Sequence, residues 1–267
     1  MGFIEAVILG IVQGITEFLP VSSSGHLVLV PAVLRWPSPS LAFDASVHLA
    51  TLIAVVAVFW HDLVRLIVSW WRGLLGGQPL ATAESRLAWW VILGTIPAVL
   101  AGIFFAGMFE SLFSSPRSVG FFLLVTALLL LLAEIFGRRR NDLTNITWLN
   151  SLLIGIGQAA AIAPGLSRSG TTMAVGMFNN LSREAAARFS FILSVPIIAG
   201  AAIIQLSKMM QSGNTEAEIP MLAVGFLAAA ISGYAVIRLL LAYLRKKPLY
   251  PFAAYCVVIG LLALIFL

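Results

Sequence analysis

Six apolar stretches of this chain are each long enough to cross a lipid bilayer. The hydrocarbon core of a bilayer is about 30 Å thick, and an α helix needs roughly 20 apolar residues to span it. The stretches cover residues 42–60, 87–108, 118–136, 187–207, 219–243 and 249–267. Of the 267 residues, 60% are hydrophobic and only 10% are charged, a balance that a soluble domain does not need. The sequence therefore predicts an all-α polytopic membrane protein.

Two polar stretches interrupt this apolar sequence and share the same internal spacing. GIVQ at 10–13 precedes SSSG at 22–25, and GIGQ at 155–158 precedes SRSG at 167–170. Each position of the second stretch follows its counterpart by 145 residues. Polar and charged side chains are costly in lipid, so their presence in apolar surroundings indicates function. We interpret the chain as a duplication in which each copy carries one functional polar segment.

The segments around these two motifs, 4–34 and 148–180, contain too many Gly, Pro and Ser residues to be plain transmembrane helices. Irregular backbone at membrane depth is tolerated only where protein or a wet cavity surrounds it. We therefore predict that each segment is a re-entrant helical hairpin, which enters the bilayer and turns back. Three spans follow each hairpin, which gives a single membrane domain over 1–267, with repeat one at 1–140 and repeat two at 145–267.

The distribution of Lys and Arg predicts the orientation, since basic residues collect in cytoplasmic loops. The loops at 61–86, 137–147 and 244–248 carry the basic clusters and are placed inside, whereas those at 109–117 and 208–218 are placed outside. The first hairpin then enters from outside and the second from inside. An odd number of spans per repeat inverts the second copy, which predicts two inverted-topology repeats with both hairpin tips near the midplane, as in transporters.

The formal net charge of the chain is +5. Its basic residues lie at the ends of the predicted helices, where attraction to lipid headgroups and the choice of topology account for them. Membrane lipids are therefore the expected surroundings, and no binding to nucleic acid is predicted.

The second polar segment, Pro164 to Thr172, combines one fixed cation, several hydroxyl groups and two glycines within nine residues. A guanidinium at membrane depth needs an anionic partner, and backbone N–H groups of a glycine-containing turn add donors for a phosphate. If a helix starts at Met173, its N-terminus adds partial positive charge at the same place. Arg168 is thus predicted to bind phosphate. The structural alternative is that Arg168 pairs with Glu17 or another acid and simply closes the two hairpins together.

The first polar segment carries the groups that phosphoryl transfer requires. Gln13 and Glu17 are four residues apart and share one helix face. The turn that follows contains Ser22, Ser23, Ser24 and His26. Such groups can attack phosphorus, move protons and stabilise developing charge. Each alone is weak evidence, because serine runs often cap or pack helices and a lone histidine is usually a packed residue.

Together, QxxxE at 13–17, PVSSSGH at 20–26 and PGLSRSGTT at 164–172 resemble the signature regions of the bacterial undecaprenyl-diphosphate phosphatase family, often called the bacitracin-resistance family. The resemblance extends over nearly the whole chain in length, hairpin placement and number of spans. It implies hydrolysis of undecaprenyl diphosphate to undecaprenyl phosphate and inorganic phosphate, which recycles the lipid carrier of peptidoglycan synthesis. It also implies a multi-pass protein of the bacterial cytoplasmic (inner) membrane, a reaction assisted by Mg²⁺ or Ca²⁺, a site open to the outer face and a homodimer. Since apolar grooves discriminate weakly between tails, other prenyl diphosphates should also be substrates.

The resemblance also assigns roles to individual residues. Glu17 would activate the nucleophile or hold the divalent cation, Ser23 would be the favoured nucleophile, and His26 would act as nucleophile, acid or orienting group. Gln13 occupies a position where the family accepts Glu or Gln, and since an amide cannot act as a base, Glu17 carries that role alone. The candidate catalytic residues are Glu17, Ser23, His26 and Arg168, and the candidate phosphate-binding residues are Gln13, Ser22, Ser24, Ser167, Arg168, Ser169 and Thr172.

Other interpretations of the same segments compete with this one. A transporter or flippase for a phosphorylated lipid would share the inverted repeats, but it would need Arg168 for binding and no nucleophile. The type 2 phosphatidic acid phosphatases resemble fragments of the motifs, but the sequence has no histidine five residues beyond Arg168. A structural scaffold would leave the cost of the buried polar groups unexplained. Asp44 and His48 lie one helical turn apart near the return of the first hairpin, which makes them a candidate pair that supports the site. The favoured prediction is that Asp44 caps or lines its helix and has no catalytic role.

Overall fold

The computed structural model describes residues 1–105, 115–212 and 219–267, and its regular structure within these ranges is helical. The α helices are α1 Phe3–Thr16, α2 Ser23–Leu34, α3 Leu41–Leu75, α4 Ala83–Phe104, α6 Pro116–Phe136, α7 Trp148–Ala160, α8 Arg168–Phe178, α9 Arg183–Ser212, α10 Ile219–Leu244 and α11 Tyr250–Phe266. A short 3-10 helix covers Leu143–Asn145. The predicted all-α class is confirmed.

Within the described ranges, five helices are long and apolar enough to cross a membrane, namely α3, α4, α6, α9 and α10. The sixth predicted span, 249–267, forms α11, whose 17 residues lie at the short end of what a span takes. The prediction of a polytopic membrane protein is confirmed. Most of the two loops predicted outside, 109–117 and 208–218, lies beyond the described residues, although α6 begins at Pro116 and α9 continues to Ser212.

The loop predicted at 61–86 is wrong over most of its length, because α3 continues to Leu75 and α4 begins at Ala83. The cytoplasmic placement of this segment stays a prediction. The helix kinks at Phe59, where φ is −100° and ψ is 16°, and then proceeds in a new direction. Beyond the kink, apolar side chains such as Leu63, Ile67 and Trp70 recur at helical spacing. The basic residues between them suggested a loop, whereas the structure places them on the other faces of an amphipathic helix.

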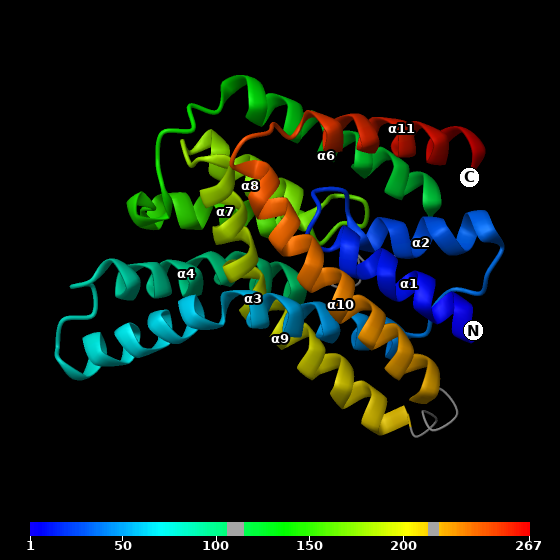
Figure 1. Ribbon diagram of the computed structural model, residues 1–267, viewed down its shortest axis with the longest axis horizontal. Coiled ribbons are helices and arrows are strands. Elements are labelled where there is room, and N and C mark those ends of the chain that lie inside the picture. Colours follow the sequence, from blue (N-terminus) through cyan, green and yellow to red (C-terminus); the bar gives the residue numbers. More distant parts are fainter. Residues whose placement is uncertain (106–114, 213–218) are drawn as a thin grey trace.

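Two helical hairpins, α1–α2 and α7–α8, occupy the segments predicted to be re-entrant, 4–34 and 148–180. They enter the bundle from opposite ends, with their connecting turns facing each other near the centre (Figure 1). Helix α1 packs on α10 and α7 packs on α4, and in both pairs a glycine of the hairpin, Gly10 or Gly155, lies against the backbone of a glycine on the partner helix. Small residues allow this close approach of helices in membranes. The similar crossings support the two inverted repeats, which stay a prediction.

Glu134, near the end of α6, joins three segments at one end of the bundle. Its side chain is 2% exposed, and its carboxylate accepts hydrogen bonds from Arg139 at 3.1 Å and from Arg183 at 2.7 Å. The backbone N–H of Leu249 donates to the same carboxylate at 2.8 Å. A buried carboxylate with this many donors is well satisfied. The cluster therefore fixes the start of α9 and the start of α11 relative to α6.

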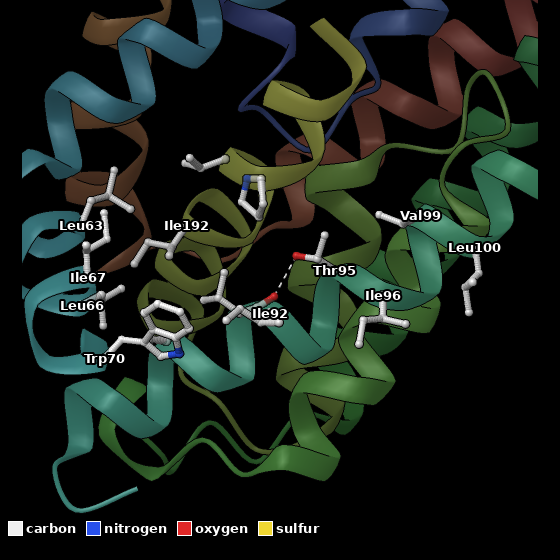
Figure 2. A pocket seen from close by; sticks show the side chains of 14 residues that line it. Leu63, Leu66, Ile67, Trp70, Ile92, Thr95, Ile96, Val99, Leu100 and Ile192 are labelled. Carbon is white, nitrogen blue, oxygen red and sulfur yellow. Dashed lines mark hydrogen bonds between the residues drawn. The ribbon is translucent and has the colours of Figure 1, made fainter. Parts of the chain in front are cut away.

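An apolar groove of about 530 Å³ runs along α3, α4 and α9. Figure 2 shows its lining side chains, such as Leu66, Ile96 and Ile192. Thr95 is a polar exception, and its hydroxyl donates to the Val91 carbonyl of its own helix at 2.8 Å. The groove contains none of the candidate catalytic or phosphate-binding residues. It is typical of a surface that contacts lipid, and we assign it no chemistry.

Candidate active site

The first tip is the turn between α1 and α2. Glu17 continues the last turn of α1, and its backbone N–H donates to the Gln13 carbonyl at 2.9 Å. Ser22 caps α2, because its hydroxyl accepts a hydrogen bond from the Gly25 N–H at 3.2 Å, and the Ser24 hydroxyl lies 3.3 Å from it. Ser22 has a φ of 70°, in the left-handed region that residues with a side chain rarely adopt. Backbone strain of this kind is concentrated at functional sites.

The second tip is the turn between α7 and α8. The expected helix start at Met173 is wrong, because α8 begins at Arg168, where the Ser167 hydroxyl caps the helix by accepting from the Gly170 N–H at 3.0 Å. The early start places Arg168 in the first turn, beside the partial positive charge of the helix N-terminus. Gly165 has a φ of +92°, and a Cβ at this position would collide with the backbone of α6. The turn therefore requires glycine at 165.

An ion pair between Arg168 and Glu17 joins the two tips. Arg168 Nη2 lies 2.6 Å from Glu17 Oε1, and the two side chains are 14% and 7% exposed. A second contact joins the tips where the Ser169 hydroxyl donates to the Leu19 carbonyl at 3.0 Å. This is the pair that the structural alternative expects, so the assignment of Arg168 to phosphate binding stays a prediction. The geometry does place the cation and the carboxylate of the two motifs at one point.

The Glu17 carboxylate also gathers donors from its own hairpin. Its Oε2 atom accepts from the Ser23 hydroxyl at 2.5 Å and from the Gln13 amide at 2.9 Å. A hydroxyl bonded to a carboxylate is the arrangement in which a general base activates a nucleophile. The structure thus brings four of the predicted site residues together: Gln13, Glu17, Ser23 and Arg168.

His26, the predicted catalytic imidazole, has its contacts elsewhere. Its Nδ1 atom lies 2.7 Å from the Ser22 carbonyl oxygen, and its Nε2 atom lies 2.7 Å from the Tyr255 hydroxyl of α11. Both ring nitrogens are therefore engaged outside the group of four residues around Glu17. Its catalytic role stays a prediction, and no sequence pattern indicates Tyr255 as its partner.

The remaining hydroxyls of the second tip are bonded within the protein. Thr172 is fully buried, and its hydroxyl donates to the Arg168 carbonyl at 2.8 Å and lies 2.6 Å from the Ser190 hydroxyl of α9. Ser167 is 1% exposed, and its hydroxyl lies 3.2 Å from that of Ser169. In this structure these side chains shape the tip and anchor α8 to α9. Their predicted binding of phosphate stays untested.

Two further side chains, Thr126 and His48, support the tips, and neither is among the candidate catalytic or phosphate-binding residues. Thr126 of α6 accepts a hydrogen bond from the Ser167 N–H at 3.0 Å and donates to the Gly165 carbonyl at 3.1 Å. His48 of α3, which the sequence offers with Asp44 as a pair near the return of the first hairpin, has its Nε2 atom 3.9 Å from Glu17 Oε2. A threonine in the middle of an apolar span is a signal that could have identified Thr126. For His48 the signal is its place near the return of the first hairpin.

The residues around Glu17 fit only a metal site with few protein ligands. Among the described residues, no group of three or more His, Cys, Asp or Glu side chains could hold a metal ion. Beside the Glu17 carboxylate, the Oε1 atom of Gln13 is buried and has no hydrogen-bond partner. Mg²⁺ is commonly held by one or two carboxylates together with phosphate oxygens of the substrate. One carboxylate and one amide oxygen fit that kind of site, which the substrate completes.

Comparison with known proteins adds an independent finding to this geometry. The sequence matches the family described as bacitracin resistance protein BacA over residues 6–262. An undecaprenyl-diphosphatase of Geotalea daltonii is 41% identical, in an alignment covering 100% of this chain and 99% of the relative. An undecaprenyl-diphosphatase of Moorella thermoacetica is 43% identical over 98% of this chain and 97% of the relative, and one of Myxococcus xanthus is 40% identical over 100% and 90%.

Proposed function

The chain belongs to the bacitracin resistance protein BacA family, and from this membership and the geometry of the paired tips we propose that it is an undecaprenyl-diphosphatase. It hydrolyses undecaprenyl diphosphate to undecaprenyl phosphate and inorganic phosphate, which returns the lipid carrier to cell-wall synthesis and confers resistance to bacitracin. The observation that carries the proposal is the Glu17 carboxylate, which is bonded both to the Ser23 hydroxyl at 2.5 Å and to Arg168 at 2.6 Å. The proposed nucleophile, the proposed base and the proposed phosphate-binding cation thus lie within one hydrogen-bonded group.

The reaction is an in-line displacement at the distal phosphorus. The Ser23 oxygen forms a bond to phosphorus while its proton passes to Glu17. The bond from phosphorus to the bridging oxygen breaks, and undecaprenyl phosphate leaves with the electron pair. Water then attacks the phosphorus of the phosphoserine and the bond from phosphorus to the Ser23 oxygen breaks. Glu17 returns its proton to the Ser23 oxygen, the protons of the water leave with inorganic phosphate, and the Glu17 carboxylate and the Ser23 hydroxyl are restored. Direct attack of water on the distal phosphorus gives the same products without a phosphoenzyme. The absence of a trappable phosphoenzyme in the unmodified protein would identify this route.

Arg168 stabilises the transferring phosphoryl group in this scheme. Its guanidinium exchanges part of its bonding to Glu17 for the equatorial phosphate oxygens, where negative charge develops. The frame behind it is rigid, because α8 is capped by Ser167 and bonded to α9 through Thr172. Such preorganisation is what makes a fixed cation effective in a site shielded from water.

A divalent cation, Mg²⁺ or Ca²⁺, belongs to the same proposal. Glu17 and the amide oxygen of Gln13 would hold it together with oxygens of the diphosphate. When bound, the ion neutralises charge on the phosphates. Because Gln13 brings no charge, Glu17 is the anionic ligand that this pair offers.

We extend the proposal to the setting of the protein. It lies in the bacterial cytoplasmic (inner) membrane, with the site open to the outer face and with a homodimer as the assembly. The outer-facing site and the homodimer are what the resemblance to the family implies. The distribution of basic residues supports the orientation of the chain alone, since Arg138, Arg139, Arg140 and the segment 245–247 lie at helix ends predicted to face the cytoplasm. Shorter prenyl diphosphates are also substrates, because an apolar contact surface gains little specificity per methylene.

The proposal is tested by measuring inorganic phosphate released from a prenyl diphosphate by the protein purified in detergent, with and without a chelator. The unmodified protein should release phosphate, the Glu17→Gln variant should release almost none, and the control Glu84→Gln, a change at an exposed carboxylate at the start of α4, should match the unmodified protein. Loss of release with the chelator would establish the cation. A folded protein that binds the lipid diphosphate but releases no phosphate would contradict the proposal and favour a carrier.

A further inference from the structure

His26 of α2 and Tyr255 of α11 form a close pair at one end of an apolar groove. The groove has a volume of about 700 Å³ and is lined mainly by apolar side chains of α2 and α11, among them Val33 and Leu262. The Tyr255 hydroxyl lies 2.7 Å from His26 Nε2. The two rings are nearly parallel, with an interplanar angle of 12° and centroids 5.6 Å apart. The tyrosine therefore fixes the imidazole by stacking and by a hydrogen bond.

The hydrogen bonds determine which nitrogen of a neutral His26 carries the proton. Nδ1 lies 2.7 Å from the carbonyl oxygen of Ser22, and because a carbonyl can only accept, Nδ1 must be the donor. Nε2 then has a free lone pair, which accepts the hydrogen bond from the Tyr255 hydroxyl. The Ser22 carbonyl thus sets the tautomer, and the Tyr255 hydroxyl stabilises it by donating to Nε2.

The carbonyl held by His26 belongs to the strained residue of the first tip. Ser22 has a φ of 70°, and conformations of this kind persist only when their surroundings enforce them. The backbone N–H of His26 reaches the same carbonyl at 3.2 Å. The next residue, Ser23, is the one whose hydroxyl bonds to Glu17 at 2.5 Å. The orientation of the Ser22 peptide therefore sets where the Ser23 hydroxyl points.

We propose that Tyr255 is a positioning residue of the active site, which acts through His26 on the Ser22 peptide and so aims Ser23 at Glu17. The inference rests on the proposed function, since positioning matters only if Ser23 takes part in the reaction. It assigns His26 an orienting role. It also explains why a tyrosine on the last helix, far away in sequence, contacts the first hairpin.

Substitution Tyr255→Phe keeps the stacked ring and removes only the hydroxyl, so the protein should fold normally. Loss of the neutral hydrogen bond between Tyr255 and His26 should lower kcat about 3- to 10-fold. KM should change less than about twofold, because positioning of the nucleophile acts on the chemical step rather than on binding. Phosphate release from a prenyl diphosphate provides both constants.

Two control variants separate this effect from general damage. Leu262→Ala removes an apolar side chain from the same groove without touching the His26 bond, and Tyr234→Phe removes a tyrosine hydroxyl on α10 that accepts from Arg238 at 3.3 Å. Both should keep kcat. The inference is wrong if Tyr255→Phe also keeps kcat, or if Leu262→Ala loses as much kcat as Tyr255→Phe.

A second measurement is independent of activity. The ¹⁵N spectrum of histidine-labelled protein, with the signals assigned by a His26→Asn variant, should show His26 protonated at Nδ1 alone. In Tyr255→Phe the two tautomers should become mixed. An unchanged His26 spectrum would overturn the inference even if the unmodified protein is an active phosphatase. Conversely, an inactive unmodified protein whose His26 spectrum responds to Tyr255→Phe would place the failure in the proposed function, on which the inference rests, and not in the link from Tyr255 to His26.

Discussion

Replacing Arg168 by lysine tests whether the site needs the two-pronged guanidinium or merely a positive charge. In the structure, one terminal nitrogen lies 2.6 Å from Glu17 Oε1 and the other lies 3.4 Å from the Ser190 carbonyl. The planar group thus spans from the first hairpin to α9. A lysine ammonium is a point charge on a flexible stem and cannot make both contacts in one plane while it also holds a phosphate.

The expected loss follows from the bonds at stake. A hydrogen bond to a charged group is worth about 1.5–3 kcal/mol, and since about 1.4 kcal/mol corresponds to a factor of ten in rate, one lost prong lowers kcat/KM about 10- to 150-fold. Arg168→Ala removes the charge as well and leaves the Glu17 carboxylate unpaired in a buried place. The lysine variant should nevertheless fall within about tenfold of the alanine variant, because geometry carries most of the effect.

The assay is phosphate release from a prenyl diphosphate at several substrate concentrations, with Arg117→Lys as the control. Arg117 is an exposed arginine in the first turn of α6, so its replacement should leave kcat/KM unchanged. Equal elution of all variants in size-exclusion chromatography would show that they are folded. Near-normal turnover by Arg168→Lys would refute the two-pronged clamp and leave only a requirement for charge.

Three further predictions follow from individual contacts. Ser23→Ala should abolish the phosphoenzyme trapped by rapid quenching, and a phosphoenzyme that persists would exclude Ser23 as the nucleophile. Gly165→Ala should lower both activity and the thermal midpoint, because its φ of +92° and the adjacent α6 backbone leave no room for a Cβ; an unchanged midpoint would contradict this. Glu134→Ala should reduce the free energy of unfolding by about 3–5 kcal/mol, since it leaves Arg139 and Arg183 without their buried carboxylate. A reduction below about 1 kcal/mol, the level of an exposed ion pair, would show that the cluster is dispensable.

The sequence was a good guide to the fold wherever apolar length or a broken polar segment determined the structure. The hairpins at 4–34 and 148–180 were found because Pro, Gly and Ser interrupt otherwise apolar runs. The extension of α3 to Leu75 is not predicted, because the basic residues Arg65 and Arg72 indicate a loop, whereas the apolar residues around them keep helical spacing. Charge alone therefore does not predict where a helix ends.

The sequence identified the centre of the candidate site but not its supporting contacts. Gln13, Glu17 and Ser23 lie near each other in the chain, and the matched spacing of the motifs led to Arg168. His26 was expected beside them, but its ring is held by Tyr255 of α11. Contacts of that kind depend on how distant helices pack, and a single sequence contains no pattern that reports them.

The central claim is that Glu17 and Arg168, from two different hairpins, form one catalytic site. Its most direct test is the rate of phosphate release by Glu17→Gln, Arg168→Ala and the double variant. Residues that act as a unit are strongly non-additive, so the double variant should be no slower than the slower single variant. Losses that multiply in the double variant would show that the two tips act independently and would contradict the shared site.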